Sequence, residues 1–250
     1  MKLYIASDLH VEFHKDKKQY IDSLFGDGDP ESTVVLAGDI DCGRTNLKHT
    51  LAQIAEKFKY AVYVPGNHEY YNGLGYGELR KVVPDLPKNV FYLDQDTIIL
   101  DNTIFIGATL WSCPTSYDYH LERDLMRFFP DFKRMKNNSV AAHRDRYFQD
   151  KAYLKLMALK QFPTEKKVIV THFLPDDRCT HPRWLKEESQ YNSYFASNVG
   201  FIEDLENATW IFGHTHDHRE LSIGQTKLYC NPIGYPNERA DKPTVLQVSI

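Results

Sequence analysis

The sequence predicts an α/β protein built on buried and mostly parallel strands. Apolar runs over 2–6, 33–37 and 60–64 alternate with segments of helical periodicity, and each run stops at a polar turn. Strands separated by helices are typically parallel, so their carboxyl ends lie at one edge of the sheet. Ligands of such sheets bind at that edge. The polar residues that follow each run are therefore the first candidates for a functional site.

The first half of the chain predicts two successive strand, helix, strand units. Amphipathic helices are expected over 20–25 and 45–58, where apolar residues recur at helical spacing. Glycine, aspartate and proline over 26–30 predict a turn between the first helix and the second strand. Each helix returns the chain to the edge from which the next parallel strand starts.

The second half changes its pattern twice. Closely spaced strands over 90–93, 97–100 and 103–108 predict a second, more antiparallel sheet. The segment 111–146 is irregular and aromatic, and its part from 121 to 146 holds seven Lys and Arg against four Asp and Glu. We interpret it as a cap-like insert over the active face; a solvated helical excursion without a ligand role is the alternative.

The remainder returns to alternating elements. A long helix is expected over 147–162, then a strand over 168–171, a polar loop over 175–194, a helix near 199–205, a strand over 209–212 and further short strands. Neither an internal repeat nor a low-complexity linker divides the sequence. We therefore predict a single domain over 1–250.

Composition and charge point to an ordinary globular protein. The 250 residues are 42% hydrophobic and 26% charged, with a formal net charge of −4 and a pI near 6.3. Binders of nucleic acid or anionic membranes usually carry a basic excess, so neither class of partner is indicated. The oligomeric state is left open.

Cysteine usage and the first apolar run favour a cytoplasmic location. The four cysteines are scattered without a Cys-x-x-Cys pair, which disfavours a disulfide framework and a zinc knuckle. The run over 3–6 leads at once into polar residues and leaves no room for a signal peptide. No run approaches the ~20 apolar residues of a membrane span.

Five apolar runs end in residue types that bind metals. These are Asp8 with His10, Asp39, Asn67 with His68, His172, and His214 with His216. In an extended backbone, residues i and i+2 face the same side, so each Asp-x-His or His-x-His pair is expected to face one site. A single histidine at a strand end is more often structural than a ligand. Five such ends together predict one common site.

The ligand types predict two divalent cations. Imidazole, carboxylate and amide donors suit manganese, iron, zinc or nickel, and the absence of cysteine from the set argues against structural zinc. The set exceeds what one tetrahedral ion needs, and the carboxylate of Asp39 can bridge two ions ~3.5–4 Å apart. Such a pair generates hydroxide near neutral pH and stabilises an in-line phosphoryl displacement. Manganese is the metal we favour.

In order and spacing, these residues resemble the calcineurin-like metallophosphoesterases. The motifs span residues 8–216 and are Asp8-x-His10, Gly38-Asp39, Gly66-Asn67-His68-Glu69, His172 and Gly213-His214-x-His216. The resemblance implies a four-layer α/β/β/α sandwich of two mixed sheets with the metals at its rim. It also implies a hydrolase in which a bridging hydroxide attacks a small phosphate mono- or diester.

The family pattern also implies the role of each motif residue. One metal would be held by Asp8, His10, Asp39 and His216. The other would be held by Asp39, Asn67, His172 and His214. His68 would not bind metal; as general acid it would donate a proton to the leaving-group oxygen. Asp39 and His68 are therefore the expected catalytic residues.

The segment after Asp39 departs from the protein phosphatases of this family. Those continue as Gly-Asp-x-x-Asp-Arg-Gly, and the later Asp orients the proton-donor histidine. Here the run is Gly38-Asp39-Ile40-Asp41-Cys42-Gly43-Arg44, with the second Asp one position early. This spacing disfavours a protein phosphatase. The short run resembles the smaller bacterial and phage-type phosphoesterases more closely, and Asp41 is left as the candidate partner of His68.

Some assignments stay open. Arg44 and Arg178 follow metal motifs and are candidates for binding the phosphate of the substrate, although a solvated loop charge explains each equally well. A serine/threonine-type protein phosphatase and a non-catalytic metal-binding scaffold of the same fold are the alternative functions. The complete set of ligands and His68 disfavours the scaffold. The expected substrate is a small phosphorylated molecule.

Overall fold

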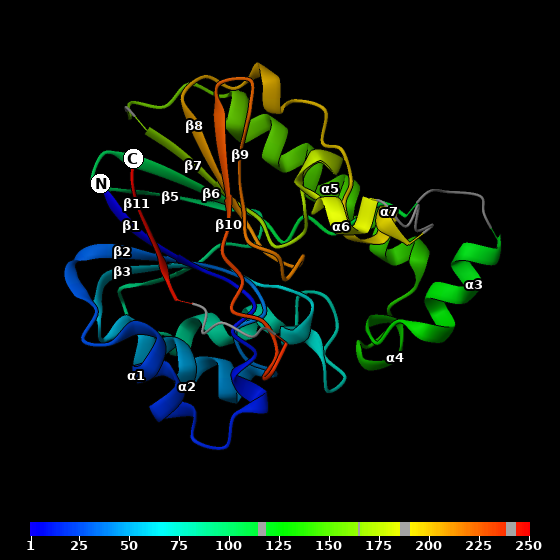
Figure 1. The fold of residues 1–250 in the computed structure, drawn as a ribbon, viewed down its shortest axis with the longest axis horizontal. Coiled ribbons are helices and arrows are strands. Elements are labelled where there is room, and N and C mark those ends of the chain that lie inside the picture. Colours follow the sequence, from blue (N-terminus) through cyan, green and yellow to red (C-terminus); the bar gives the residue numbers. More distant parts are fainter. Residues whose placement is uncertain (115–118, 165, 186–190, 239–243) are drawn as a thin grey trace.

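The computed structural model describes residues 1–114, 119–164, 166–185, 191–238 and 244–250. Within these ranges two β-sheets pack face to face, with helices on their outer faces (Figure 1). The two chain ends lie together, where the amino group of Met1 donates to the carbonyl oxygen of Ile250 at 3.0 Å. The predicted α/β class and the four-layer sandwich of two mixed sheets are confirmed.

The first sheet has the order β11-β1-β2-β3-β4. Its strands are β1 (Lys2–Ala6), β2 (Asp29–Ala37), β3 (Phe58–Val64), β4 (Val90–Tyr92) and β11 (Leu246–Ser249). The first four are mutually parallel, and β11 is antiparallel to β1. The parallel strands therefore end at one edge, as the sequence predicts.

The second sheet has the order β5-β6-β7-β8-β10-β9. Its strands are β5 (Asp96–Leu100), β6 (Thr103–Gly107), β7 (Lys166–Val170), β8 (Ala208–Phe212), β9 (Arg219–Ile223) and β10 (Thr226–Cys230). The central strands β6, β7, β8 and β10 are parallel, and the edge strands β5 and β9 are antiparallel.

Alternate strand residues build two separate cores. On β2, Val35 faces the other sheet and packs with Phe105 and Ile211. Its neighbours Val34 and Leu36 belong to the core beneath the helices. Because side chains alternate between the two faces of a strand, a continuous apolar run is buried on both sides.

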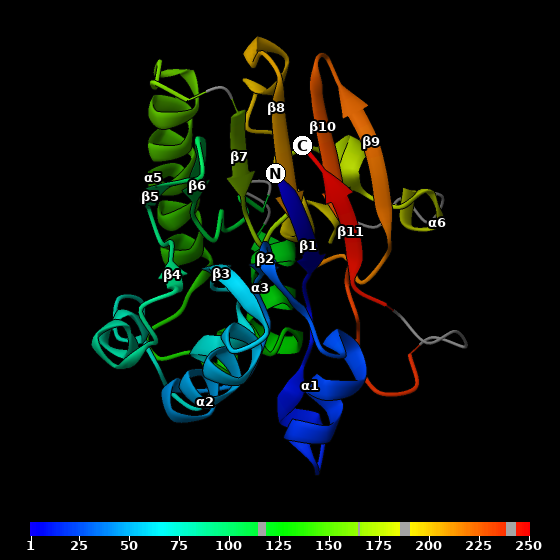
Figure 2. The same cartoon turned by 90° about the vertical axis from the view of Figure 1, so that its left-hand side faces the viewer.

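Helices cover the outer face of each sheet (Figures 1 and 2). On the first sheet lie α1 (Lys17–Phe25) and α2 (Arg44–Ala55), and on the second lies α5 (Val140–Leu159). The remaining α-helices are α3 (Tyr119–Phe128), α4 (Asp131–Arg134), α6 (Pro182–Leu185) and α7 (Asn192–Phe195). Short 3-10 turns occupy Val11–Phe13, His68–Tyr70, Leu79–Asp85, Asp177–Cys179 and Ile202–Asp204.

The sequence misassigns the sheet of one strand, β4, and the last residue of one helix, α2. The pattern predicts β4 in the second sheet, but this strand pairs in parallel with β3, because the 3-10 turn Leu79–Asp85 lies in the crossover that parallel strands require. Helix α2 ends at Ala55, and the expected last residue of that helix, Phe58, instead begins β3.

Two further predictions need correction downstream. Helix α5 begins at Val140 rather than at residue 147, because the hydroxyl of Ser139 accepts from the amide of Ala142 and caps the helix. Near 199–205 the chain forms only the 3-10 turn Ile202–Asp204. The segment 111–146 thus contains α3, α4 and the start of α5.

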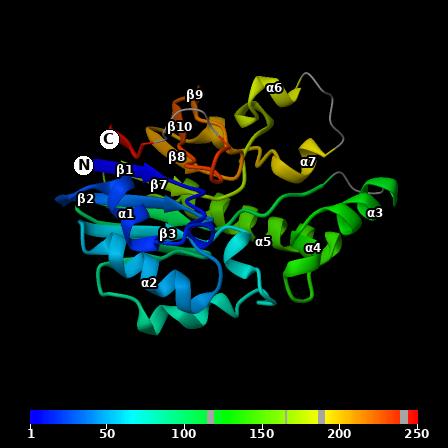
Figure 3. The same cartoon turned by 60° about the horizontal axis from the view of Figure 1, so that its bottom comes forward.

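The helices α3 and α4 extend beyond the sheets beside α7 (Figure 3). The ring of Phe129, between α3 and α4, lies 4.6 Å from the ring of Tyr194 on α7. Among the described helices none combines the length and the hydropathy needed to cross a bilayer.

Candidate metal centre

The ends of β1, β2, β3, β7 and β8 meet at the edge shared by the two sheets. The amide of His214, which follows β8, donates to both carboxylate oxygens of Asp8 at 3.1 Å each and so joins the sheets. Asp8, His10 and His172 are fully buried, and Asp39 is 2% exposed. Buried ionisable groups at this density require partners of opposite charge.

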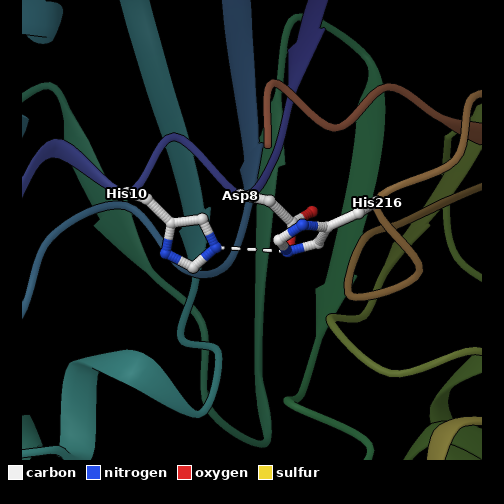
Figure 4. Close-up of side chains that lie close together, drawn as sticks. All are labelled: Asp8, His10 and His216. Carbon is white, nitrogen blue, oxygen red and sulfur yellow. Dashed lines mark hydrogen bonds and ion pairs between the residues drawn. The ribbon is translucent and has the colours of Figure 1, made fainter. Parts of the chain in front are cut away.

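One ligand group consists of Asp8, His10 and His216 (Figure 4). The Nε2 atoms of the two histidines lie 3.2 Å apart, and Nε2 of His216 lies 3.4 Å from Oδ1 of Asp8. Burial raises the pKa of Asp8, but its contact with His216 outweighs burial and lowers the pKa to about 2. The carboxylate is therefore ionised and able to bind a cation.

A second ligand group surrounds Nε2 of His172. This atom lies 3.0 Å from Oδ1 of Asn67, 3.2 Å from Nδ1 of His214 and 3.5 Å from Oδ2 of Asp39. The same Oδ2 atom lies 3.9 Å from Nε2 of His10. The Asp39 carboxylate thus stands between the two groups.

The donor atoms fit divalent cations. His172 donates its Nδ1 hydrogen to the carbonyl oxygen of Ala37 at 2.8 Å, so Nε2 of the neutral ring presents a lone pair. That lone pair faces the amide oxygen of Asn67 and the carboxylate of Asp39. Acceptors that converge in this way repel one another unless a proton or a metal cation lies among them.

The pKa values of the ring nitrogens predict how cations bind. Burial lowers the pKa of His172, but Asp39 outweighs burial and raises it to about 9. For His216, the contacts with Asp8 and Glu238 likewise outweigh burial and raise the pKa to about 10. Burial holds the pKa of His10 and His214 below the usual value. At pH 7 the metal-free protein therefore carries one protonated ring in each ligand group.

Metal affinity is consequently expected to rise with pH. A cation must displace the proton of His172 in one group and of His216 in the other, so each binding step releases about one proton. We expect the apparent Kd for Mn²⁺ at each site to fall about tenfold per pH unit between pH 6 and pH 8. Titration calorimetry in buffers of different ionisation enthalpy measures the released protons; a pH-independent affinity would contradict this protonation pattern.

Five of the expected ligands have a left-handed backbone. The φ angles are 52° for Asp8, 48° for His10, 56° for Asp39, 67° for His214 and 52° for His216. Such angles are uncommon outside glycine and cluster at functional sites. The expectation that Asp8 and His10 share a site is met, but the reason is a left-handed turn at each residue rather than an extended strand.

Two motif glycines allow this close approach. A Cβ at Gly66 would lie 2.2 Å from Oδ1 of Asp39, and one at Gly38 would lie 2.4 Å from Nδ1 of His172. Gly38 also has a φ of 84°. Buried Glu69 then joins the two turns, since its carboxylate accepts the amides of Gly66, Asp39 and Ile40 at 2.7 to 3.1 Å.

The partner of His68 is Glu12, and the assignment to Asp41 is wrong. Nδ1 of His68 lies 2.9 Å from Oε1 of Glu12, and Nδ1 of His10 lies 3.3 Å from the same oxygen. Asp41 faces the other way, where it accepts from the ammonium of Lys17 and the hydroxyl of Thr50 at 2.7 Å. One carboxylate thus orients both a predicted ligand and the predicted general acid.

Electrostatics keep this pair charged. Burial lowers the pKa of His68, but Asp39 and then Glu12 outweigh burial and raise it. Burial raises the pKa of Glu12, but its bonds to His10 and His68 outweigh burial and lower it to about 2. His68 therefore retains a proton to higher pH than a free histidine.

The C-terminal segment supplies two contacts that the sequence does not reveal. The hydroxyl of Tyr235 lies 3.0 Å from Nε2 of His68, and its ring stacks on His10 at 4.2 Å. Oε2 of Glu238 lies 2.7 Å from Nδ1 of His216. Tyr235 and Glu238 follow the last motif in a segment with turn-forming prolines, so no local sequence pattern marks them. Glu12, in contrast, lies two residues after His10 and could have been recognised from that spacing.

The insert reaches the site through Asp131, the first residue of α4. This carboxylate is 1% exposed, and its Oδ1 accepts from Nδ2 of Asn67 at 2.9 Å and from the hydroxyl of Tyr71 at 2.5 Å. The hydroxyl of Tyr194 donates to Oδ2. Because Nδ2 of Asn67 faces Asp131, the Oδ1 atom of the amide is turned toward His172.

We therefore expect Asp131→Asn to weaken one metal site selectively. The neutral amide keeps one acceptor oxygen but loses the charge that strengthens the bond to the Asn67 amide, so the affinity of the second cation is expected to fall about 10- to 100-fold. Tyr194→Phe removes a bond to the other oxygen and serves as the matched control, with a loss of less than about threefold. Calorimetric titration with Mn²⁺ measures both variants; equal losses would show that Asp131 acts through packing alone.

A cavity of about 680 Å³ opens beside these residues. Its lining includes Asp39, Asn67, His68, His214 and His216, together with parts of the insert, α6 and α7. Four of the seven predicted metal ligands, together with His68, thus form one wall of a pocket.

Neither predicted arginine belongs to the described lining of this cavity. Arg178 pairs instead with Asp176 and Glu203 at 2.7 Å each, and Arg44 is exposed at the start of α2. The arginine that lines the cavity is Arg134, for which no carboxylate partner is found among the described residues.

Comparisons with known proteins agree with this geometry. A sequence model described as "Calcineurin-like phosphoesterase" matches residues 1–218. An uncharacterized protein of Acanthamoeba polyphaga mimivirus is 26% identical over 263 residues, covering 95% of this chain and 92% of the relative.

Solved structures show a similar fold. The phosphopantetheinyl hydrolase of Mycobacterium tuberculosis superposes with a TM-score of 0.72 at 15% identity, covering 98% of this chain and 95% of its own. A protein of Thermus thermophilus superposes with a TM-score of 0.50 at 9% identity, covering 92% of this chain and 88% of its own. At these identities the likeness concerns the fold alone.

Proposed function

Because the chain belongs to the calcineurin-like phosphoesterase family of phosphoric ester hydrolases, we propose that it hydrolyses a small phosphate mono- or diester at a pair of divalent cations. The observation that carries this proposal is the position of Oδ2 of Asp39, 3.9 Å from Nε2 of His10 and 3.5 Å from Nε2 of His172. A carboxylate between two sets of nitrogen and oxygen donors is the arrangement of a two-metal hydrolase.

We assign the ligand sets from the family pattern, which the donor groups around His216 and around His172 support. One cation would be held by Asp8, His10, Asp39 and His216, and the other by Asp39, Asn67, His172 and His214. When bound, two such cations lower the pKa of water and stabilise negative charge on the phosphoryl oxygens. The close packing of the ligands within the rigid sheet edge holds them in place before substrate arrives.

His68 would act as general acid toward the leaving group. Glu12 holds Nδ1, which leaves Nε2 as the atom that can give a proton to the alkoxide or phenolate oxygen. The hydroxyl of Tyr235 lies 3.0 Å from that atom and fixes the orientation of the ring from its other side. The raised pKa of His68, caused by Asp39 and Glu12, favours the protonated form of the ring that can donate.

We further propose that residues 111–146 cap the site of a single-domain enzyme. Phe129, Pro130, Asp131 and Arg134 line the cavity, and Asp131 also holds Asn67. A pocket closed on one side in this way favours a small phosphorylated molecule over a folded protein substrate. These contacts also argue against the insert as a solvated excursion without a ligand role.

Hydrolysis of chromogenic esters tests the proposal. Metal-free protein is expected to hydrolyse p-nitrophenyl phosphate or bis(p-nitrophenyl) phosphate only after Mn²⁺ is added, and a chelator is expected to abolish the activity. Fe²⁺, Zn²⁺ and Ni²⁺ added in parallel compare the other candidate metals. Folded protein that binds cations yet hydrolyses neither ester would overturn the proposal and favour a scaffold.

Arg134→Ala is expected to affect phosphomonoesters more than diesters. A monoester carries an additional negative charge, and loss of the guanidinium at the cavity is expected to raise its KM about tenfold. Arg44→Ala is the matched control, because Arg44 is exposed outside the cavity. Steady-state kinetics on the two ester types measures the difference; an equal KM change in both variants would contradict a role for Arg134.

A further inference from the structure

We propose that the part of the cavity away from the metal ligands is a subsite for an aromatic group of the substrate. The enzyme would then prefer phosphate esters of alcohols that carry an aromatic ring over esters of small aliphatic alcohols. The inference rests on the proposed phosphoesterase function and adds the class of alcohol. It follows from the size of the cavity, its lining, and the continuity of that lining with the metal centre.

The cavity is larger than the reacting group requires. Its volume of about 680 Å³ falls within the roughly 300–1,000 Å³ of pockets that enclose whole small molecules. A phosphoryl group held against Asp39, Asn67 and His214 would leave most of this space unfilled. The remaining volume is therefore available to the organic part of the ester.

The walls of that remaining volume are aromatic. The ring of Phe129 lies 5.5 Å from the ring of Tyr191 and 6.1 Å from that of Phe195. All three line the cavity and are only partly buried. Trp184 adds further ring surface to the lining. Ring faces and edges at such spacing favour a flat apolar group over a hydrated polar one.

The aromatic wall begins at a predicted metal ligand. The ring of Phe195 lies 5.3 Å from the ring of His214, and the wall continues through Phe129 into the insert. The aromatic wall thus starts next to the place where a phosphate would be bound, on the side of His214. Because the wall and the metal ligands are continuous, a ring attached to the ester by a short linker can contact both.

Binding of non-hydrolysable phosphonates tests the subsite without turnover. We expect the Mn²⁺-loaded protein to bind benzylphosphonate about tenfold more tightly than methylphosphonate, which corresponds to about one aromatic contact. In Phe129→Ala and Phe195→Ala the preference is expected to fall below about threefold, with the affinity for methylphosphonate unchanged. Phe128→Ala is the matched control, since Phe128 is 58% exposed and outside the described lining.

Kinetics on benzyl and ethyl phosphate separates the subsite from the proposed function. Both alcohols are similar leaving groups, so a tenfold higher kcat/KM for the benzyl ester supports the subsite. If the unmodified protein binds the two phosphonates equally, the subsite is overturned whatever the variants do. The subsite is also overturned if Phe128→Ala loses the preference for benzylphosphonate as much as Phe129→Ala and Phe195→Ala do. Preferential binding of benzylphosphonate by a protein that hydrolyses neither these two esters nor bis(p-nitrophenyl) phosphate would instead refute the phosphoesterase function and leave the subsite standing.

Discussion

Asp39→Asn is expected to lower kcat/KM by about three orders of magnitude or more and to remove at least one of two bound cations. The substitution takes away the negative charge between the two ligand groups, where Oδ2 lies 3.5 Å from His172 and 3.9 Å from His10. Metal-assisted stabilisation of the transition state supplies several kcal/mol, and each ~1.4 kcal/mol is a factor of ten in rate.

Metal analysis beside kinetics measures this effect. The control is Asp41→Asn, the same substitution two residues further along the same loop, at a carboxylate bonded to Lys17 and Thr50. Asp41→Asn is expected to reduce stability but to keep both cations and the activity per folded molecule. Two cations and unimpaired turnover in Asp39→Asn would mean that this carboxylate does not bridge.

His68→Ala is expected to lower kcat about 10²- to 10⁴-fold while both cations stay bound. The loss should depend on the leaving group. Esters of aliphatic alcohols need the proton and should be affected most, whereas p-nitrophenolate leaves unaided and should be affected least. A series of esters with leaving groups of graded pKa measures this dependence. A uniform loss across the series, accompanied by loss of metal, would assign His68 to metal binding instead.

Glu12→Gln extends this test to the residue that holds His68. Because one oxygen of Glu12 faces Nδ1 of both His68 and His10, the variant is expected to lose about 10- to 100-fold in kcat/KM. The same leaving-group dependence should appear, since the orientation of the acid is disturbed. Asp41→Asn again serves as the control, and an effect as large there would indicate a general change in the loop.

The convergence of the expected metal ligands could be predicted from sequence because each of them follows an apolar strand closely. A buried run such as 60–64 that ends in Pro65-Gly66-Asn67-His68 is a local pattern, and parallel strands bring their carboxyl ends to one edge. The fold follows from the same regularity. The sequence pattern misplaces β4 because its crossover contains a 3-10 turn, which lacks the periodicity of an α-helix.

The residues that orient the site could not be found in this way. Tyr235 meets His68 across 167 positions of sequence, and Asp131 meets Asn67 across 64. A buried carboxylate in an aromatic, charged segment looks the same in sequence as an exposed one. Asp41 is close to Asp39 along the chain, but its carboxylate accepts hydrogen bonds from Lys17 on α1 and Thr50 on α2 rather than from His68.

Anomalous diffraction from crystals grown with Mn²⁺ tests most directly whether these strand ends bind a pair of cations. Two anomalous peaks roughly 3.5–4 Å apart are expected. One should lie among Asp8, His10, Asp39 and His216, and the other among Asp39, Asn67, His172 and His214. A single peak, or peaks bound by other side chains, would contradict a two-metal centre at this edge.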